Sequence, residues 1–352
     1  MELRNIILIL LVLVIALSTK SYSAGPEFTL LAKSGSVEYK ANKKSWKPIS
    51  TKQEFGLWDR IKISKGGYAC LLYKDGQTIE FTANTKNLEY TVSEMKKKLK
   101  GKSSGISSKF AEYVVDEMSD TDDFFSDNDY HDDMSTTGAV NRANRKNVDT
   151  KDELSNMTGD DGTTELLNAV GSTFLGGDDS FIVTRLPGNS YVMDKKIRFS
   201  WYRNPHVKVY AIHLTDRHNK ELLKENVLDT SIVIDFSSVN IVRGENYYWH
   251  VTDKQGERKS DEYCLQWITK NEIDNILEAV DQIFREFGGE KSPMANLAVA
   301  RLYADKNIMG RAIDTYKKAN EIAPGVKEFK LLYAKYLDRI GLTDEAKHLM
   351  GK

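Results

Sequence analysis

Hydrophobic and polar positions change their spacing three times along this chain. From residue 28 to 95, apolar and polar residues alternate over short runs such as FTLLAKSGSVEYKA and RIKIS, which predicts β-strands. Asp75-Gly76 separates two apolar runs and predicts a tight hairpin, because glycine takes a positive φ at no steric cost. Short strands return from residue 180 to 269, and after Lys270 the spacing becomes helical.

The second β region consists of apolar runs separated by turn-like stretches such as LPGNS and RGEN. Several short strands at this spacing predict an antiparallel β-sandwich. The pattern is similar to immunoglobulin-like and fibronectin-type modules at the level of architecture. That resemblance implies that Trp201 lies in the core. The runs are FIVTRLP, KIRFSW, VKVYAIHL, SIVIDF, YYWHV and YCLQWI.

The segment after Lys270 predicts a helix over residues 271–287, ended by Gly288-Gly289. Pro293 is expected in the first turn of the next helix, where its missing N–H costs little. The apolar residues near one face of the first helix are Ile273, Ile276, Leu277, Val280, Phe284 and Phe287.

Residues 293–324 form one pattern, with a first helix, a turn at Gly310, and a second helix that Pro324 ends. Small side chains on the facing sides let two helices approach closely. The pattern resembles a tetratricopeptide repeat, a helix hairpin of about 34 residues, with Asn296 in place of the family's usual tryptophan. An ordinary helical bundle with alanine-rich crossings is the alternative. A shift by one repeat maps Ala300 to Ala334 and Ala312 to Ala346. The expected packing residues are therefore Ala300, Tyr303, Ala312, Tyr316, Ala319, Pro324, Ala334 and Ala346.

Two repeats are fewer than the roughly three that usually bury a continuous core. We therefore expect these helices to lean on other parts of the chain, first on the helix at 271–287. We also expect a partner protein or a second copy to cover the last helix at Ala346, Leu349 and Met350. The polar positions predicted to face a protein partner from the concave surface are Asn296, Arg301, Lys330 and Lys335.

The first β region resembles the FecR-like domain family over about 60 residues. The resemblance is carried by Gly35-Ser36-Val37, by the stretch WKPI from Trp46, by LWDRIKIS from Leu57, and by the hairpin at Asp75-Gly76. Trp58 stands where the family usually has glycine. The resemblance implies a small all-β module facing the periplasm. The family's signalling role needs a cytoplasmic segment, and only five residues precede the first apolar run, so we do not expect that role here.

The N-terminus predicts export. Arg4 precedes the apolar run IILILLVLVIAL, and small residues follow it, which is typical of a secretory signal peptide cleaved after Ser23 or Ala24. The run is shorter than the ~20 residues that span a bilayer. We expect a periplasmic or other extracytoplasmic protein without membrane attachment after cleavage. An uncleaved anchor is the alternative.

Residues 112–133 include ten acidic residues and neither lysine nor arginine. This composition buries too little apolar surface to offset the entropy of ordering, which predicts a linker. The fold class is thus multidomain α+β. The expected order is a signal peptide (1–24), a FecR-like β domain (25–118), an acidic and polar linker (119–179), an immunoglobulin-like β-sandwich (180–269) and tetratricopeptide-like helices (270–352).

Neither the net charge nor the sequence motifs indicate nucleic-acid binding or catalysis. Fifty basic and 51 acidic residues leave a net charge of -1, so no global field favours nucleic acid. Metalloprotease, dithiol, serine-hydrolase and phosphate-loop motifs are all missing, so we expect no catalytic centre, cofactor or metal site. His213 and His250 are interpreted as structural strand residues. Cys70 and Cys264 are interpreted as buried apolar side chains rather than a disulfide.

These observations predict a non-catalytic exported envelope protein that acts as a protein-binding adaptor or scaffold through its helices. The alternative function is cell-wall or glycan binding by the β domains. Its candidate residues are the aromatic side chains Trp46, Trp58, Tyr202 and Tyr248.

Overall fold

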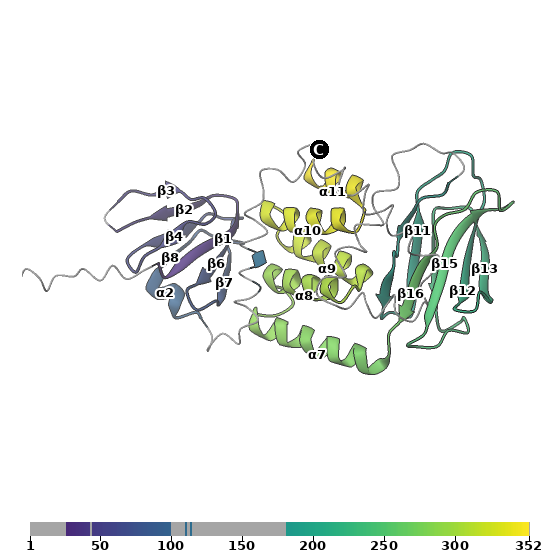
Figure 1. Cartoon of the computed structure of the whole chain (residues 1–352). Coiled ribbons are helices and arrows are strands. Elements are labelled where there is room, and N and C mark those ends of the chain that lie inside the picture. Colours follow the sequence, from purple (N-terminus) through teal and green to yellow (C-terminus); the bar gives the residue numbers. More distant parts are fainter. Residues whose placement is uncertain (1–25, 43, 100–109, 111–112, 115–180, 352) are drawn as a thin grey trace, which may run out of the picture.

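Two β modules lie on either side of a layer of helices (Figure 1). The structure is a computed structural model that describes residues 26–42, 44–99, 110, 113–114 and 181–351. The α+β fold class is confirmed. The predicted signal peptide (1–24) and linker (119–179) lie outside the described residues. Within the described part, no helix is long and apolar enough to cross a membrane.

The first module is a sandwich of two four-stranded sheets, with strand orders β4-β1-β6-β7 and β3-β2-β5-β8. The predicted hairpin joins β6 to β7 and is confirmed. Gly76 has a φ of 91°, and its N–H donates to the Tyr73 carbonyl at 2.9 Å. The elements are β1 (Phe28–Ser34), β2 (Val37–Lys40), β3 (Lys47–Pro48), β4 (Glu54–Phe55), β5 (Arg60–Ile63), β6 (Tyr68–Tyr73), β7 (Thr78–Thr82), β8 (Leu88–Thr91) and the short helix α2 (Val92–Lys96).

Strand β6 is buried on both faces. Its residues Ala69 and Leu71 point into the sandwich core, whereas Tyr68 and Cys70 belong to the cluster formed by the helices. Two-sided burial explains why the sequence YACLLY is almost continuously apolar instead of alternating. One sheet of the module therefore serves two cores.

The second module packs a five-stranded sheet, β10-β16-β15-β12-β13, on a three-stranded sheet, β14-β11-β9. The predicted sandwich is confirmed, and Trp201 lies in its core with 1% of its surface exposed. The strands are β9 (Thr184–Leu186), β10 (Ser190–Val192), β11 (Lys196–Trp201), β12 (Tyr210–Asp216), β13 (Glu221–Val227), β14 (Ser231–Asp235), β15 (Asn246–Asp253) and β16 (Tyr263–Trp267).

Two features of this module differ from the sequence expectation. β10 and β13 were not predicted as strands, and β10 pairs with β16 in parallel, so the sandwich is not purely antiparallel. β13 reads ELLKENV and is mostly polar because it lies at the sheet edge, where β12 is its one partner among the described strands. β13 has no alternating apolar pattern of its own, and its pairing with β12 makes it a strand.

The helical layer begins with α7, which a capping box at Thr269 starts one residue earlier than predicted. α8 starts with Pro293 in its first turn, as predicted, and the hydroxyl of Ser292 accepts from the Ala295 N–H. Leu277 was expected on the buried face of α7 but is exposed. The helices are α7 (Lys270–Glu286), α8 (Pro293–Asp305), α9 (Met309–Ile322), α10 (Lys327–Arg339) and α11 (Thr343–Met350).

The predicted turn at Gly310 is wrong. The chain reverses at Asn307, whose φ of 52° lies in the left-handed region, and Gly310 already belongs to the first turn of α9. Asparagine is one of the few residues other than glycine that tolerate this conformation. The prediction placed the turn at the glycine, but the residue with the positive φ is the asparagine three positions earlier.

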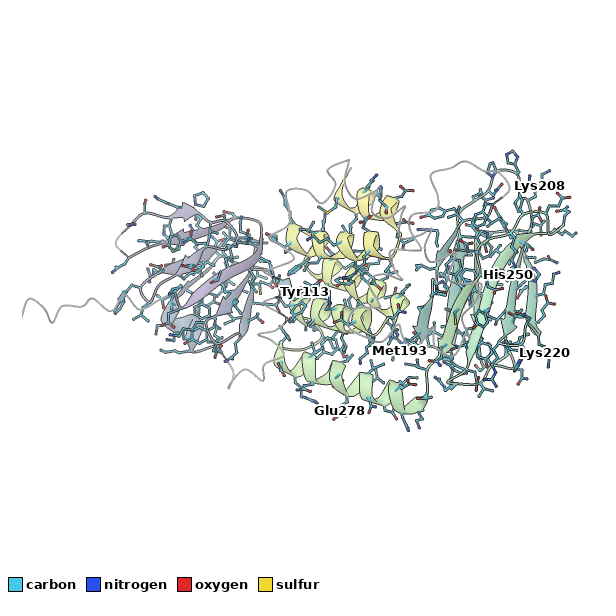
Figure 2. All side chains as sticks on the ribbon, in the orientation of Figure 1. Tyr113, Met193, Lys208, Lys220, His250 and Glu278 are labelled. Carbon is cyan, nitrogen blue, oxygen red and sulfur yellow. The ribbon has the colours of Figure 1, made fainter. Side chains whose placement is uncertain are left out.

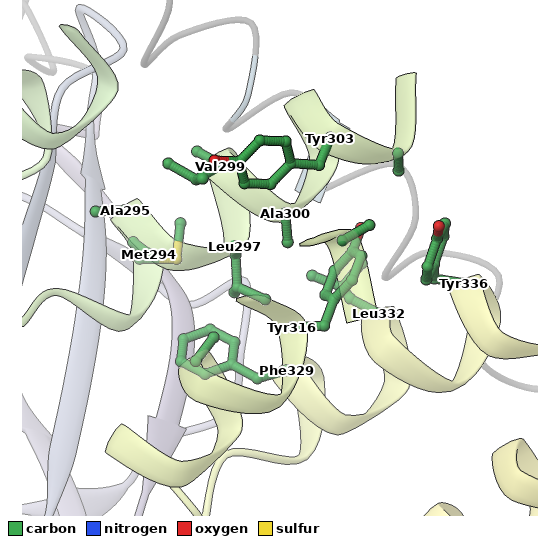
Figure 3. Packing of buried hydrophobic residues seen from close by; sticks show 14 of the residues in the cluster. Met294, Ala295, Leu297, Val299, Ala300, Tyr303, Tyr316, Phe329, Leu332 and Tyr336 are labelled. Atoms are coloured by element: carbon green, nitrogen blue, oxygen red, sulfur yellow. The ribbon is translucent and has the colours of Figure 1, made fainter. Parts of the chain in front are cut away.

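Alanine and tyrosine side chains fill the space between the helices, as Figure 3 shows for Ala300 and Tyr316. Tyr316 stacks on Tyr333 and Tyr336 with ring centroids 5.7 and 5.1 Å apart. The predicted packing residues Ala300, Tyr303, Ala312, Tyr316, Ala319, Ala334 and Ala346 are all buried, while Pro324 is exposed just beyond the end of α9.

The first module closes one side of the helical layer with apolar contacts. Tyr68 meets Phe329 edge to face, with centroids 5.8 Å apart. Beside them, the Tyr68 hydroxyl and the Met294 N–H both donate to the carboxylate of Glu80, the latter at 3.0 Å. A side chain of β7 therefore caps the start of α8, and the predicted need of the helices for outside support is met here.

The second module closes the other side mainly with polar contacts. Asn307 donates from its side chain to the Asn189 carbonyl at 3.1 Å, and Arg311 forms a two-pronged ion pair with Asp194. Arg185 pairs with Glu345 of α11. Met193 adds an apolar contact at the same junction (Figure 2).

Gly310→Ala should raise the free energy of unfolding by about 0.5–1 kcal/mol, because alanine restricts the unfolded chain and favours the helix. A Cβ at this position meets no atom within 4 Å. Gly288→Ala is the matched control, since its Cβ also meets open space but its φ is +89°. Urea unfolding should show that the control loses stability. Equal effects of both substitutions would contradict this account.

Glu80→Gln should make the free energy of unfolding less dependent on pH. Burial raises the pKa of the Glu80 carboxyl above its ordinary value of 4.5, against hydrogen bonds that lower it. Stability from this group is therefore full below pH 4.5 and is lost as the pH rises through the folded-state pKa.

Glutamine accepts the same hydrogen bonds without the buried charge. The stability of the Glu80→Gln variant relative to the natural chain should therefore increase as the pH rises above 4.5. Glu54→Gln, at an exposed position of the same module, serves as the control. A Glu80→Gln difference that stays constant with pH would contradict the assignment.

Candidate interaction surface

Asn296 does not lie on an open surface, which corrects the sequence expectation. It is fully buried on α8, and its side-chain amide donates to the carbonyls of Glu290 and Ser292 at 2.8 and 2.7 Å. The side chain thus holds the turn that leads into α8. Partner contact by Asn296 is incompatible with this placement.

Arg301, in contrast, already contacts a segment from elsewhere in the chain. Its guanidinium carbon lies 4.3 Å from the centroid of the Tyr113 ring, and its Nε is 2.7 Å from the Asp305 carboxylate. Burial lowers the pKa of Arg301, but Tyr113 and Asp305 outweigh that effect and raise it. The side chain is therefore a permanent cation held over an aromatic ring.

The segment that Arg301 contacts presents a short apolar face to the helices. The ring centroids of Phe110 and Phe287 are 5.8 Å apart in an edge-to-face contact, and Val114 is fully buried in the same cluster. Phe110, Tyr113 and Val114 are helical in the described residues and have the spacing i, i+3, i+4. Figure 2 places Tyr113 at the side of the helical layer that is nearer the first module.

Lys330 and Lys335 are half-buried on α10 rather than widely exposed. The last helix is also less open than expected. Ala346 is fully buried, and Leu349 and Met350 pack partly against the helical cluster. The surface that the sequence assigned to a partner or a second copy is thus covered in part within the chain.

The four aromatic candidates for glycan binding fall into different environments. Trp58 is 72% exposed in the turn before β5, and Trp46 is half-buried between Lys40 and Lys62, each 5.8 Å from its ring centroid. Tyr202 lies at the junction with α11, where its hydroxyl donates to Glu345 at 3.1 Å.

Tyr248 is half-buried on the outer face of the second module, in line with His250 on β15. The structure therefore does not collect the four aromatic side chains into one surface, since Tyr202 is occupied at a junction and Tyr248 belongs to the other module.

His213 and His250 lie opposite each other on β12 and β15 and stack with centroids 4.7 Å apart. His213 is also within 3.1 Å of the Glu221 carboxylate and of the Thr252 hydroxyl. Burial lowers the pKa of His213, against the raising effect of Glu221. Sequence analysis placed both residues in strands but did not predict that they pair.

The described residues contain no group of three or more His, Cys, Asp or Glu side chains arranged to hold a metal ion. Cys70 is buried, Cys264 is half-buried, and neither forms a disulfide. Burial raises the pKa of the Cys70 thiol well above its ordinary value, which disfavours the reactive thiolate.

Two cavities lie where the helices meet the β modules. A pocket of 430 Å³ at the second module is lined by α7, the end of α8, Tyr191 and Ile268. A groove of 770 Å³ at the first module lies between β7, β8, residues 97–99 and the segment 285–292. Sequence analysis could not find either one, because each is formed by elements far apart in the chain.

Comparisons with known proteins give no family. No family model and no curated protein matches the chain. Among solved structures, the spore cortex lytic enzyme SleM of Clostridium perfringens is 23% identical, with a TM-score of 0.19, over 25% of this chain and 28% of that one.

Two other matches are fibronectin-type modules. A Fn3-like protein from Clostridium thermocellum is 16% identical (TM-score 0.19, 24% of this chain and 92% of that one). The fn3 domain of human collagen alpha-1(XX) is 14% identical (TM-score 0.21, 27% of this chain and 94% of that one). At such scores these likenesses carry no argument about function.

Arg301→Ala and Tyr113→Ala should be coupled by about 1 kcal/mol in a double-mutant cycle, because the guanidinium and the ring form a partly buried cation–π contact. Urea unfolding of the natural chain, both single variants and the double variant measures this coupling. Arg217→Ala combined with Tyr113→Ala is the control, since Arg217 pairs with Glu245 on the second module. Additive effects of Arg301→Ala and Tyr113→Ala would refute the contact.

Proposed function

We propose that this chain is a non-catalytic scaffold protein, exported to the cell envelope, whose helical layer binds a protein partner. The FecR-like and tetratricopeptide-like resemblances and the N-terminal apolar run of the sequence support this proposal. The observation that carries it is the contact between Arg301 and Tyr113. The helical layer there holds a short helical segment through aromatic and apolar side chains, which is how helical peptides are often recognised.

The proposed partner surface is the face of α8 around Arg301, together with α10. Because the segment with Phe110, Tyr113 and Val114 covers this face within the chain, a partner helix would bind there by displacing that segment. A partner helix with an aromatic residue at i, another at i+3 and a branched residue at i+4 reproduces the chemistry of Phe110, Tyr113 and Val114. Lys330 and Lys335 would lie at the margin of this contact and favour acidic neighbours in the partner. Asn296 has no part in it.

Glycan binding is the weaker alternative because it rests on Trp58. Its side chain is the most exposed large apolar side chain of the first module in the described residues. One exposed indole supplies a single stacking surface. Protein binding is supported by the contact between Arg301 and Tyr113, whereas glycan binding is supported by one exposed ring.

A photo-crosslinking residue at Lys330 should capture one discrete partner in cells that naturally make this protein. Arg301→Glu in the same chain should abolish the adduct, because it reverses the charge that faces the aromatic ring. The same crosslinker at Lys220, on the exposed surface of the second module, is the control. Identical adducts from Lys330 and Lys220, or adducts that survive Arg301→Glu, would refute the proposal.

A further inference from the structure

The 770 Å³ groove at the first module, here named the β7 groove, exposes the edge of a β-sheet. Its floor includes every residue of β7, and β8 forms part of the same side. β7 is the terminal strand of its sheet, and β8 is terminal in the other sheet of the sandwich. The groove therefore runs along the open side of the sandwich, facing the end of α7.

Along this edge, part of the backbone of β7 has no hydrogen bond to another described residue. The Gln77 carbonyl accepts from Tyr73 at 2.7 Å, and the Ala83 N–H donates to Gly67 at 2.9 Å, which fixes the set of residues that bond to the neighbouring strand. In antiparallel pairs the two sets alternate. The N–H and C=O groups of Thr78, Glu80 and Thr82 therefore point toward the groove, where the described part of the chain places no strand.

Positive charge lines the groove on two sides. Lys97 and Lys98 follow α2 on one wall, and Arg285 and Lys291 lie on the opposite, helical wall. All four are exposed, and no ion pair with another described residue occupies any of them.

Two carboxylates also line the groove, but both are engaged. Glu80 accepts from Tyr68 and Met294, and Glu286 accepts from Gln282 at 3.5 Å. The groove thus combines a row of backbone donors and acceptors with a net positive charge from four exposed cations, of which Lys98 lies 5.3 Å from the centroid of the Tyr90 ring.

We propose that β7 accepts an added strand from an acidic, extended segment of a partner protein. The segment pairs with the backbone of Thr78, Glu80 and Thr82 and extends the sheet by one strand. Successive side chains of a strand point to opposite faces. Carboxylates at neighbouring positions therefore reach Lys97 and Lys98 on one wall, or Arg285 and Lys291 on the other.

The distribution of charge favours this occupant over others. Positive side chains beside a sheet edge repel basic strands and disfavour pairing with apolar ones, which would bury the charge, and so protect the edge from aggregation. The same residues attract an acidic strand, for which the cations on both walls are complementary. The five residues of β7 extend over roughly 17 Å, enough to pair with a short peptide. This inference is independent of the partner face at Arg301 and involves none of its residues.

The test uses the full chain and a fluorescein-labelled octapeptide of alternating glutamate and valine, followed by fluorescence anisotropy. Binding should saturate and should weaken as salt increases, because exposed charges are screened. Because alternation places all the glutamates of this peptide on one face, one of Lys97→Glu and Arg285→Glu, which come from opposite walls, should reduce affinity about tenfold, and the other should change it little. A lysine–valine octapeptide should not bind. Affinity unchanged in both charge-reversed variants would overturn the proposal.

Backbone pairing needs a separate measurement from charge. One version of the glutamate–valine peptide carries N-methyl groups on its glutamates and a second version carries them on its valines. In a paired strand only one of these sets of N–H groups faces β7, so one version should lose binding and the other should keep it within about twofold. Equal behaviour of the two versions would overturn strand addition.

Lys208→Glu is the matched control for charge reversal. Lys208 is exposed on the far side of the second module (Figure 2), so the substitution changes the net charge equally without touching the groove. It should leave peptide affinity unchanged. A loss equal to that of the groove variant that weakens binding would show that the peptide responds to net charge alone, which would also overturn the proposal. Circular dichroism of each variant checks that the fold is retained.

Discussion

The structure depends on the burial of α8 from all sides. Ten of its thirteen residues are buried, including residues on opposite faces of the helix. A helix of this kind is stable only inside a core, because most of its surface is apolar. Two helix pairs do not enclose it alone, so the β modules complete the enclosure. The helical layer is therefore the centre of the molecule (Figure 1).

The two sides of this layer are held by different physics. Toward the first module, apolar residues of β1 and β6 join the helical cluster directly, so module and helices share one core. Toward the second module, ion pairs such as Arg311 with Asp194 carry much of the contact and are about half exposed. Ion pairs in such positions contribute little stability. The first module and the helices are thus the more firmly joined pair.

The difference has consequences for function. Asn296 was predicted to contact a partner, but its side chain is buried and hydrogen-bonded within the central layer. The surfaces that we propose for recognition lie where two segments from different parts of the chain meet. The contact of Arg301 with Tyr113 and the open edge of β7 are both of this type. Each joins a side chain or a backbone edge to a segment from elsewhere in the chain.

Local features were predictable from the sequence, because short-range backbone preferences decide them. The hairpin at Asp75-Gly76 and the start of α8 at Pro293 follow from the conformations that these residues permit. The buried alanines followed from their spacing. The candidate site was predicted less well, since Arg301 lies at a contact with another segment while Asn296 does not face outward.

The sequence by itself therefore determined the kinds of elements, their order and most of their ends. Only the tertiary structure decided that β6 is buried on both faces, that β10 pairs in parallel with β16, and that Glu80 caps a helix more than 200 residues later. The physical reason is that these features are contacts between distant segments. Their energy depends on which surfaces meet, and no spacing along a single stretch of chain records that.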